Sequence, residues 1–125
     1  MRRQNLIILI ACLQGASGVA LAAAAAHAQT SRSLEIASSF LLIHAAVGLG
    51  LAGISAYEHS SRQWLTGLSL ALQASVTLFA ADLAARSLLG TRIFPYAAPI
   101  GGSAAIISWL GLSVWALKNL YSPTR

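Results

Sequence analysis

The sequence predicts an all-α integral membrane protein: a four-helix antiparallel transmembrane bundle with both termini in the cytoplasm. Two observations carry this prediction. Of the 125 residues, 57% are hydrophobic and only 9% are charged, whereas soluble domains carry about 25% charged residues. In addition, four long stretches contain no Asp, Glu, Lys or Arg: residues 4–31, 36–57, 63–81 and 93–117. Each stretch has roughly the 20 residues that a helix needs to cross a hydrocarbon core of about 30 Å.

We expect one domain over residues 1–125, with helices over about residues 5–26, 34–57, 64–89 and 99–120. In lipid the backbone must satisfy its own hydrogen bonds, and a helix does so within a single segment. The connections are short, which predicts that consecutive helices are antiparallel neighbours. Gly90 is suited to the end of the third helix, and Pro99 is suited to the first turn of the fourth.

The first stretch also has a rival interpretation. Arg2 and Arg3, the apolar run after them and the A-x-A pattern of residues 26–28 are together typical of a secretory signal peptide. The apolar run is longer than the core of a usual signal peptide, however. We therefore expect the first stretch to remain in the protein as a membrane-spanning helix.

The basic residues predict the orientation, because Lys and Arg are enriched in cytoplasmic loops. An antiparallel arrangement divides them into two sets, Arg2, Arg3, Arg62, Lys118 and Arg125 on one side and Arg32, Arg86 and Arg92 on the other. Four aromatic residues that suit a membrane interface belong to the first side: Tyr57, Trp64, Trp115 and Tyr121. We predict that this side is cytoplasmic and that the protein is a multi-pass protein of the bacterial inner membrane.

Small residues are frequent along the predicted helices. Lipid tails compete with apolar side chains, so transmembrane helices associate through close contact at small residues. We predict that five glycines lie at helix contacts: Gly15, Gly18, Gly48, Gly101 and Gly102. The expected partners are membrane lipid and either other integral membrane subunits or further copies of the chain. The net charge of +5 is scattered singly, without the basic stripe of a nucleic-acid-binding protein, so no nucleic acid is expected.

Four polar residues are predicted near the membrane midplane. With a rise of about 1.5 Å per residue, Gln14, His44, Gln73 and Ser108 lie at similar depths in their helices. An ionisable residue within a membrane raises a functional hypothesis, and His44 is the only one of the four that titrates. It would relay a proton or hold a small molecule. The alternative is that it bonds Gln14 or Gln73 and sets the helix register, with about 0.6–2 kcal/mol per bond.

A second polar group is expected at the outer boundary, comprising His27, Arg32, Glu35, Asp82, Arg86 and Arg92. Asp82 and Arg86 have the i, i+4 spacing that permits an ion pair on one helix. Either this pair only neutralises the helix end, or it forms part of an outward-facing pocket for a ligand or a partner loop. His27 and His44 differ in depth, which disfavours haem ligation by two histidines. We predict no cofactor and no metal.

Several segments resemble a known family. Residues 15–28 resemble a helix rich in glycine and alanine that ends in G-A-H-A, and residues 34–46 resemble a second helix that reaches H-A-L at His44. Leu78 and Phe79 stand where the family begins F-S-G-S-L, and residues 99–102 with 108–109 are similar to its P-I-G-G…G-W signature. The chain thus resembles the domain-of-unknown-function 423 family, which includes bacterial YgdD-like proteins and transmembrane protein 256.

The resemblance spans nearly the whole chain and implies a four-helix inner-membrane protein with no established biochemical activity. Three places depart from the family pattern. Ala26 and Ser108 each replace a glycine, and residues 80–82 replace serine-glycine-serine. Asp82 and Arg86 are therefore peculiar to this chain or its near relatives, and the resemblance assigns them no role.

The predicted function is that of a non-catalytic accessory or structural subunit that packs against a larger membrane complex. The short loops and the many close-packing residues favour this function, and the roles of nucleophile, base and electrostatic stabiliser cannot be assigned. The alternative is proton or small-molecule handling, with a quinone-like compound bound at the polar layer around His44 or at the outer cluster around Asp82.

Overall fold

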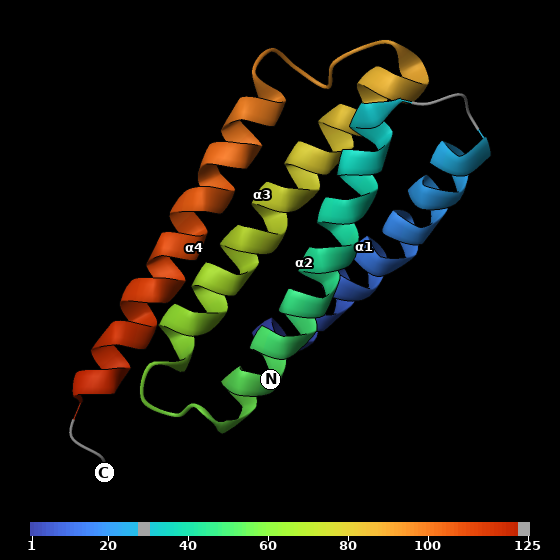
Figure 1. Cartoon of the computed structure of the whole chain (residues 1–125). Helices are drawn as coiled ribbons and strands as arrows, with labels where there is room; N and C mark the ends of the chain where they lie inside the picture. The colour runs from blue at the N-terminus through green and yellow to red at the C-terminus, as the bar shows by residue number, and fades with distance from the viewer. Residues whose placement is uncertain (28–30, 123–125) are drawn as a thin grey trace.

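Four long helices make up the computed structural model, which describes residues 1–27 and 31–122 (Figure 1). They are α1 (Arg2–His27), α2 (Arg32–Tyr57), α3 (Arg62–Leu89) and α4 (Ala97–Tyr121). All four predicted helices are present, and each begins two or three residues before the predicted start. The predicted starts followed the apolar runs, whereas α1, α2 and α3 each begin at an arginine. Arg125 and the Ala28 of the A-x-A pattern lie outside the described residues.

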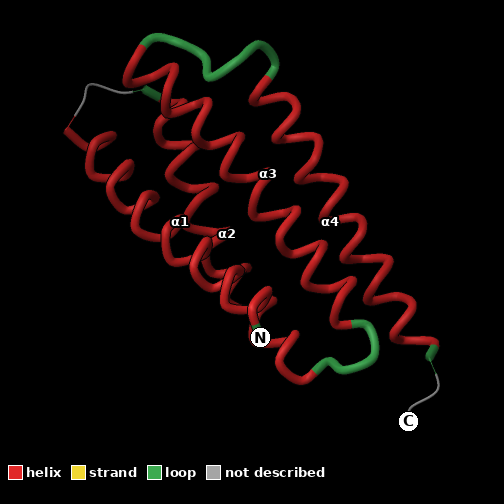
Figure 2. The backbone as a smooth tube through the Cα atoms, turned by 180° about the vertical axis from the view of Figure 1, so that it is seen from behind, coloured by secondary structure: helices red, strands yellow, loops and turns green. Residues whose placement is uncertain are grey.

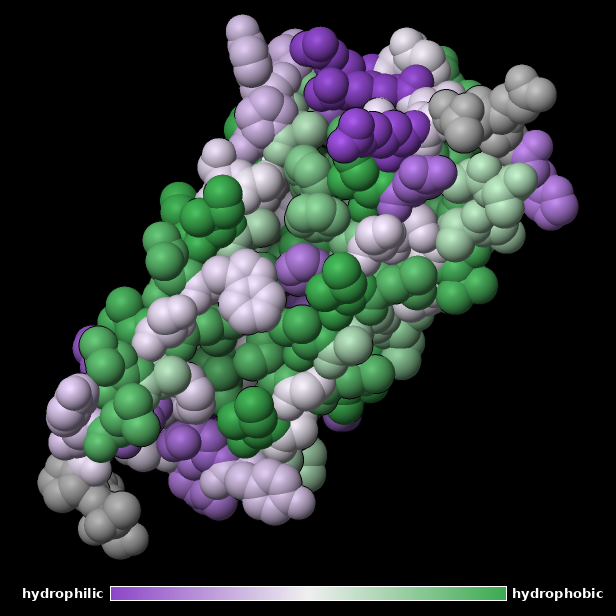
Figure 3. Space-filling model, viewed as in Figure 1, coloured by the Kyte–Doolittle hydropathy of each residue, from purple (hydrophilic) through white to green (hydrophobic). Residues whose placement is uncertain are grey.

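Each helix is long and apolar enough to cross a membrane. The helices contain 25 to 28 residues, which corresponds to about 38–42 Å at 1.5 Å per residue. This length exceeds the hydrocarbon thickness of about 30 Å, so each helix is longer than a membrane crossing requires. Figure 3 agrees, because hydrophobic residues cover most of the middle of the face shown and hydrophilic residues gather mainly at its two ends.

The helices run up and down in sequence order but do not close into a ring (Figures 1 and 2). α2 packs closely against both α1 and α3, and α3 packs closely against α4 and more loosely against α1. Within the described part of the chain, the backbone of α4 approaches neither α1 nor α2. A closed bundle would place α4 beside α1. The structure is instead a group of three helices, with α4 added on the free side of α3.

Three of the five predicted glycines lie at very close helix approaches. A Cβ atom built at Gly101 would lie 2.7 Å from the Phe79 backbone nitrogen and 2.9 Å from the Ser75 carbonyl oxygen, so α3 and α4 meet backbone to backbone. A Cβ at Gly18 would lie 2.8 Å from Cγ of Leu42. At Gly48 it would lie 2.5 Å from Nε2 of Gln73. Distances this short require the neighbouring atoms to move if a Cβ is added. At Gly101 these neighbours are backbone atoms, whereas at Gly18 and Gly48 the nearest ones belong to side chains.

The other two glycines predicted to lie at helix contacts have ordinary neighbours. A Cβ at Gly15 would lie 3.7 Å from Ala45, and a Cβ at Gly102 would lie 3.6 Å from the Phe79 ring. Gly111, which the sequence analysis did not single out, is close to a partner helix, with a built Cβ 2.6 Å from Cδ2 of Leu68.

The connection between α3 and α4 occupies residues 90–96. Gly90 ends α3 with a φ of 69°, a left-handed conformation that glycine adopts without steric cost. Tyr96 precedes α4 with a φ of 66°, and it is the one described non-glycine residue with positive φ. Pro99 lies in the first turn of α4, as predicted. The connection thus turns the chain back toward α3 and sets where α4 begins.

Candidate functional site

The four predicted midplane residues are all buried. The exposed fractions are 3% for Gln14, 7% for His44, 0% for Gln73 and 5% for Ser108. Their hydrogen bonds, however, do not form one shared layer. Ser108 donates its hydroxyl to the Ala104 carbonyl of its own helix, at 2.8 Å. The remaining three residues take part in two separate arrangements.

The first arrangement links α1, α3 and α2 through glutamine amides. Gln14 Nε2 donates to the Gln73 carbonyl oxygen at 3.1 Å and to Thr77 Oγ1 at 3.0 Å. Gln73 Nε2 donates in turn to the His44 carbonyl oxygen at 3.0 Å. The Gln73 side chain passes over Gly48, where there is room for it. Side-chain hydrogen bonds in membranes contribute about 0.6 kcal/mol on average, so this arrangement mainly sets the register of three helices.

The second arrangement holds the His44 ring between α2 and α4. Its Nδ1 lies 2.8 Å from the Phe40 carbonyl oxygen, and the Trp109 indole N–H donates to Nε2 at 3.3 Å. Because a carbonyl can only accept, Nδ1 carries the proton and Nε2 accepts. The two bonds therefore assign a neutral imidazole with both nitrogens in use.

The partners of the His44 ring differ from the two glutamines that the sequence suggested. Gln73 reaches only the backbone of His44, and the ring turns instead toward Trp109 of α4. In the sequence, Trp109 stands out only as part of the family signature. One signal could have identified it, because tryptophan in a membrane helix belongs mainly at the interface, whereas Trp109 lies about halfway along α4.

Near the α3–α4 connection, the predicted Asp82–Arg86 ion pair is present. Asp82 is fully buried, and its Oδ1 also accepts a hydrogen bond from the Ile93 backbone N–H at 3.0 Å. Asp82 therefore ties the α3–α4 connection to α3. The structure leaves His27, Arg32 and Glu35 exposed at the same end of the molecule, and they do not join this arrangement.

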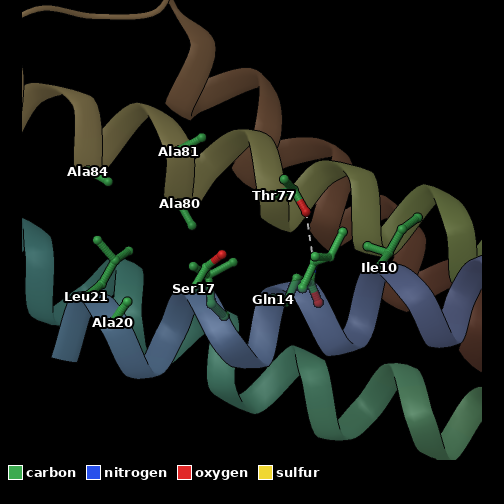
Figure 4. Close-up of a pocket in the computed structure, with 11 residues that line it drawn as sticks. Ile10, Gln14, Ser17, Ala20, Leu21, Thr77, Ala80, Ala81 and Ala84 are labelled. Carbon is green, nitrogen blue, oxygen red and sulfur yellow. Dashed lines mark hydrogen bonds between the residues drawn. The ribbon is translucent and has the colours of Figure 1, made fainter. Parts of the chain in front are cut away.

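A groove opens between α1 and α3 where these two helices approach each other loosely. It has a volume of about 530 Å³. Figure 4 shows Ala80 and Ala84 of α3 pointing toward α1, and Gln14 bonded to Thr77 farther along the groove. We call this cavity the α1–α3 groove; its small and polar lining residues are Gln14, Ser17, Ala20, Thr77, Ala80, Ala81 and Ala84.

Two further cavities lie on the side of the molecule where α4 is added. One, of about 440 Å³, is lined by Phe40 and His44 of α2, Val76 and Phe79 of α3, and Gly102, Ala105, Ile106 and Trp109 of α4. The other, of about 520 Å³, lies at the α3–α4 connection and is lined by Phe79, Arg86, Arg92, Tyr96, Ala98, Pro99 and Gly102. Phe79 and Gly102 line both cavities, and neither cavity shares a residue with the α1–α3 groove.

Residues 20–102 match the model of a family described as "Protein of unknown function (DUF423)". The chain belongs to this family. Comparison with curated proteins and with solved structures finds no match. The matched segment of this DUF423 protein contains His44, Gln73 and Asp82, whereas Gln14 and Trp109 lie outside it.

The polar interior of this DUF423 protein joins helices to one another. Amides connect α1, α3 and α2, the imidazole and indole connect α2 and α4, and the carboxylate of Asp82 holds the connection between α3 and α4. Within residues 1–27 and 31–122, no three His, Cys, Asp or Glu side chains converge where they could hold a metal ion.

Proposed function

We propose that this DUF423 protein is a non-catalytic accessory subunit of a larger complex in the membrane. Its α1–α3 groove receives a transmembrane helix of the partner subunit. The observation that carries this proposal is the groove itself, which faces outward over the middle of the helices. Its lining combines small residues of α1 and α3 with four larger apolar ones, Ile10, Leu13, Leu21 and Leu41.

The chemistry of the groove suits a helix. Transmembrane helices associate where small residues allow close packing. Ser17 and Ala20 line the groove from α1, and Ala81 and Ala84 line it from α3. A volume of about 530 Å³ gives room for large apolar side chains of a neighbouring helix, and packing in membranes depends on such van der Waals contact.

The internal hydrogen bonds support a non-catalytic role. A proton relay at His44 needs partners that exchange protons with the ring, but Nδ1 is bonded to a backbone carbonyl and Nε2 to an indole N–H, and neither group readily takes up or releases a proton. Gln14 and Gln73 likewise use their amide nitrogens to bond other helices. These groups stabilise the arrangement of the helices that form the walls of the groove.

Crosslinking in native membranes tests the proposal. A photoreactive amino acid replaces Ala84 inside the groove, and a matched control replaces Ile107, which is exposed on α4. We expect the Ala84 probe to form one discrete adduct with a different membrane protein, identified by mass spectrometry. We expect the Ile107 probe not to form that adduct.

Two outcomes contradict the proposal. Adducts with lipid alone at both positions would show that the groove holds no protein partner. An adduct at twice the mass of the chain would show self-association instead of an accessory role. As a second arm, Ala84→Trp fills the groove. It should abolish copurification of the partner, while helical content by circular dichroism stays unchanged.

A further inference from the structure

The two cavities beside α4 adjoin at Phe79 and Gly102, which line both, and we describe them together as one groove. The groove begins at the α3–α4 connection, where Arg86, Arg92 and Tyr96 line it. It ends where His44 of α2 and Trp109 of α4 are joined by their hydrogen bond. We call it the α2–α4 groove. It is charged at one end and apolar along the rest.

The length of the α2–α4 groove matches one leaflet of a bilayer. Ten residues separate Arg86 from Val76 on α3, and ten separate Pro99 from Trp109 on α4. Both separations correspond to about 15 Å along a helix, which is half of the hydrocarbon thickness of about 30 Å. A transmembrane helix would need a groove through both leaflets, whereas this one stops at the midplane.

The open end of the groove carries positive charge. Arg86 and Arg92 both line it, and the one acidic residue that pairs there, Asp82, is fully buried behind Arg86. Two guanidinium groups against one carboxylate leave one positive charge in excess. Arginine binds phosphate oxygens with paired N–H donors, and basic pockets between transmembrane helices bind the head groups of anionic lipids. Figure 3 shows hydrophilic side chains gathered at this end.

The apolar part of the groove has an aromatic wall. The ring centroids of Phe40 and Phe79 are 4.9 Å apart, and those of His44 and Trp109 are 6.0 Å apart, so the rings of each pair pack against each other. On α4 the lining includes Ile106 and Trp109 together with two small residues, Gly102 and Ala105. The absence of bulk at these two positions leaves the cavity open to a flexible hydrocarbon chain.

We propose that the α2–α4 groove binds one anionic phospholipid from the leaflet on the side of the α3–α4 connection. Arg86 and Arg92 hold the phosphate, and one acyl chain lies along Phe79, Gly102 and Ala105 as far as Trp109. This lipid site is separate from the α1–α3 groove and does not depend on the proposed partner subunit.

Native mass spectrometry of the full-length protein in mild detergent tests the site. The protein is titrated with phosphatidylglycerol and, separately, with phosphatidylcholine. We expect one phosphatidylglycerol to be retained per chain in preference to phosphatidylcholine. Arg92→Gln removes a charged phosphate contact and should weaken phosphatidylglycerol binding about tenfold, the scale of one charge-assisted hydrogen bond. Gly102→Leu should also weaken binding, because its side chain occupies the space of the acyl chain.

The control for Arg92→Gln is Arg32→Gln, which removes an exposed arginine at the same end of the molecule. The control for Gly102→Leu is Ser103→Leu, which places a leucine next to Gly102 but outside the groove. Both should bind phosphatidylglycerol as the unchanged protein does. Circular dichroism and gel filtration establish that every variant is folded.

Two results would overturn the lipid site. Equal retention of both lipids, unaffected by Arg92→Gln and Gly102→Leu, would show ordinary annular lipid. Displacement of phosphatidylglycerol by inorganic phosphate, with Gly102→Leu still binding normally, would show a site for free anions without an acyl chain. Neither result affects the crosslinking expected at Ala84. The lipid site and the accessory role can therefore be disproved separately.

Discussion

The indole N–H of Trp109 on α4 donates a hydrogen bond to Nε2 of His44 on α2, across 3.3 Å. The backbones of these two helices do not approach each other, so the two long side chains span the space between them. The bond connects α4 to the three-helix group independently of α3. It also forms the midplane end of the α2–α4 groove.

A double-mutant cycle of Trp109→Phe and His44→Ala should show favourable coupling between the two residues. We expect a coupling of about 0.6–1.7 kcal/mol, the range for side-chain hydrogen bonds between membrane helices. The measurement is the free energy of unfolding in detergent. Trp64→Phe is the control, because Trp64 is exposed, and it should show no coupling to His44→Ala. A coupling of zero for the Trp109 pair would contradict the assigned bond.

Gly101→Ala should destabilise the protein by about 1–3 kcal/mol, the cost of overpacking a tight contact. The new Cβ would lie 2.7 Å from a backbone nitrogen of α3, and backbone atoms cannot turn aside as a side chain does. Gly53→Ala is the matched control, because a Cβ there meets nothing within 4 Å. The control should be neutral or stabilising by up to about 1 kcal/mol. Thermal unfolding distinguishes the two variants, and equal effects would exclude a close α3–α4 contact.

Asp82→Ala should loosen the α3–α4 connection. The change leaves Arg86 without its carboxylate and the Ile93 N–H without its acceptor, and a buried group left unsatisfied costs about 1–3 kcal/mol. Hydrogen exchange read by mass spectrometry should become faster over residues 90–96 and stay unchanged at the α2–α3 connection. Glu35→Ala removes an exposed carboxylate at the same end of the molecule and should alter neither region.

Acidification should loosen the α2–α3 connection through Glu58. Hydrogen bonds from the backbone N–H groups of Ser61 and Ser60 hold the pKa of Glu58 below its usual value. Because the folded-state pKa is the lower one, the stabilisation is present at neutral pH and is lost as pH falls below the ordinary range of a glutamate. Trp115 donates to the Ser61 hydroxyl at 2.8 Å, so tryptophan fluorescence can follow the change.

The matched control for this pH dependence is Glu58→Gln, which removes the titrating group. The fluorescence of the variant should vary less between neutral and acidic pH than that of the unchanged protein. The same acid response in both proteins would assign the transition to another group.

The helices were predictable because charged residues bound the apolar runs, and lipid permits few other structures for such runs. The Asp82–Arg86 pair was predictable for a similar reason, since i, i+4 spacing is a local property of one helix. The helix starts were placed two or three residues too late, because an apolar run marks the hydrocarbon core, while a helix extends into the polar interface.

Which polar side chains meet between helices could not be predicted from the sequence. Equal depth suggested that His44 meets a glutamine, but depth does not tell which way a side chain turns around its helix. The rotation of α2 and the position of α4 on α3 bring the imidazole to Trp109 instead. The open arrangement could not be predicted either. Short connections make consecutive helices pack side by side, but they do not determine whether the first helix contacts the last.

The position of α4 bears on how the protein is made. Proteins fold largely from the N-terminal end during synthesis, and α1, α2 and α3 complete their mutual contacts without α4. Docking of α4 on the free side of α3 would then require no earlier contact to open. A chain that ends before residue 97 would therefore keep the mutual contacts of the three-helix group.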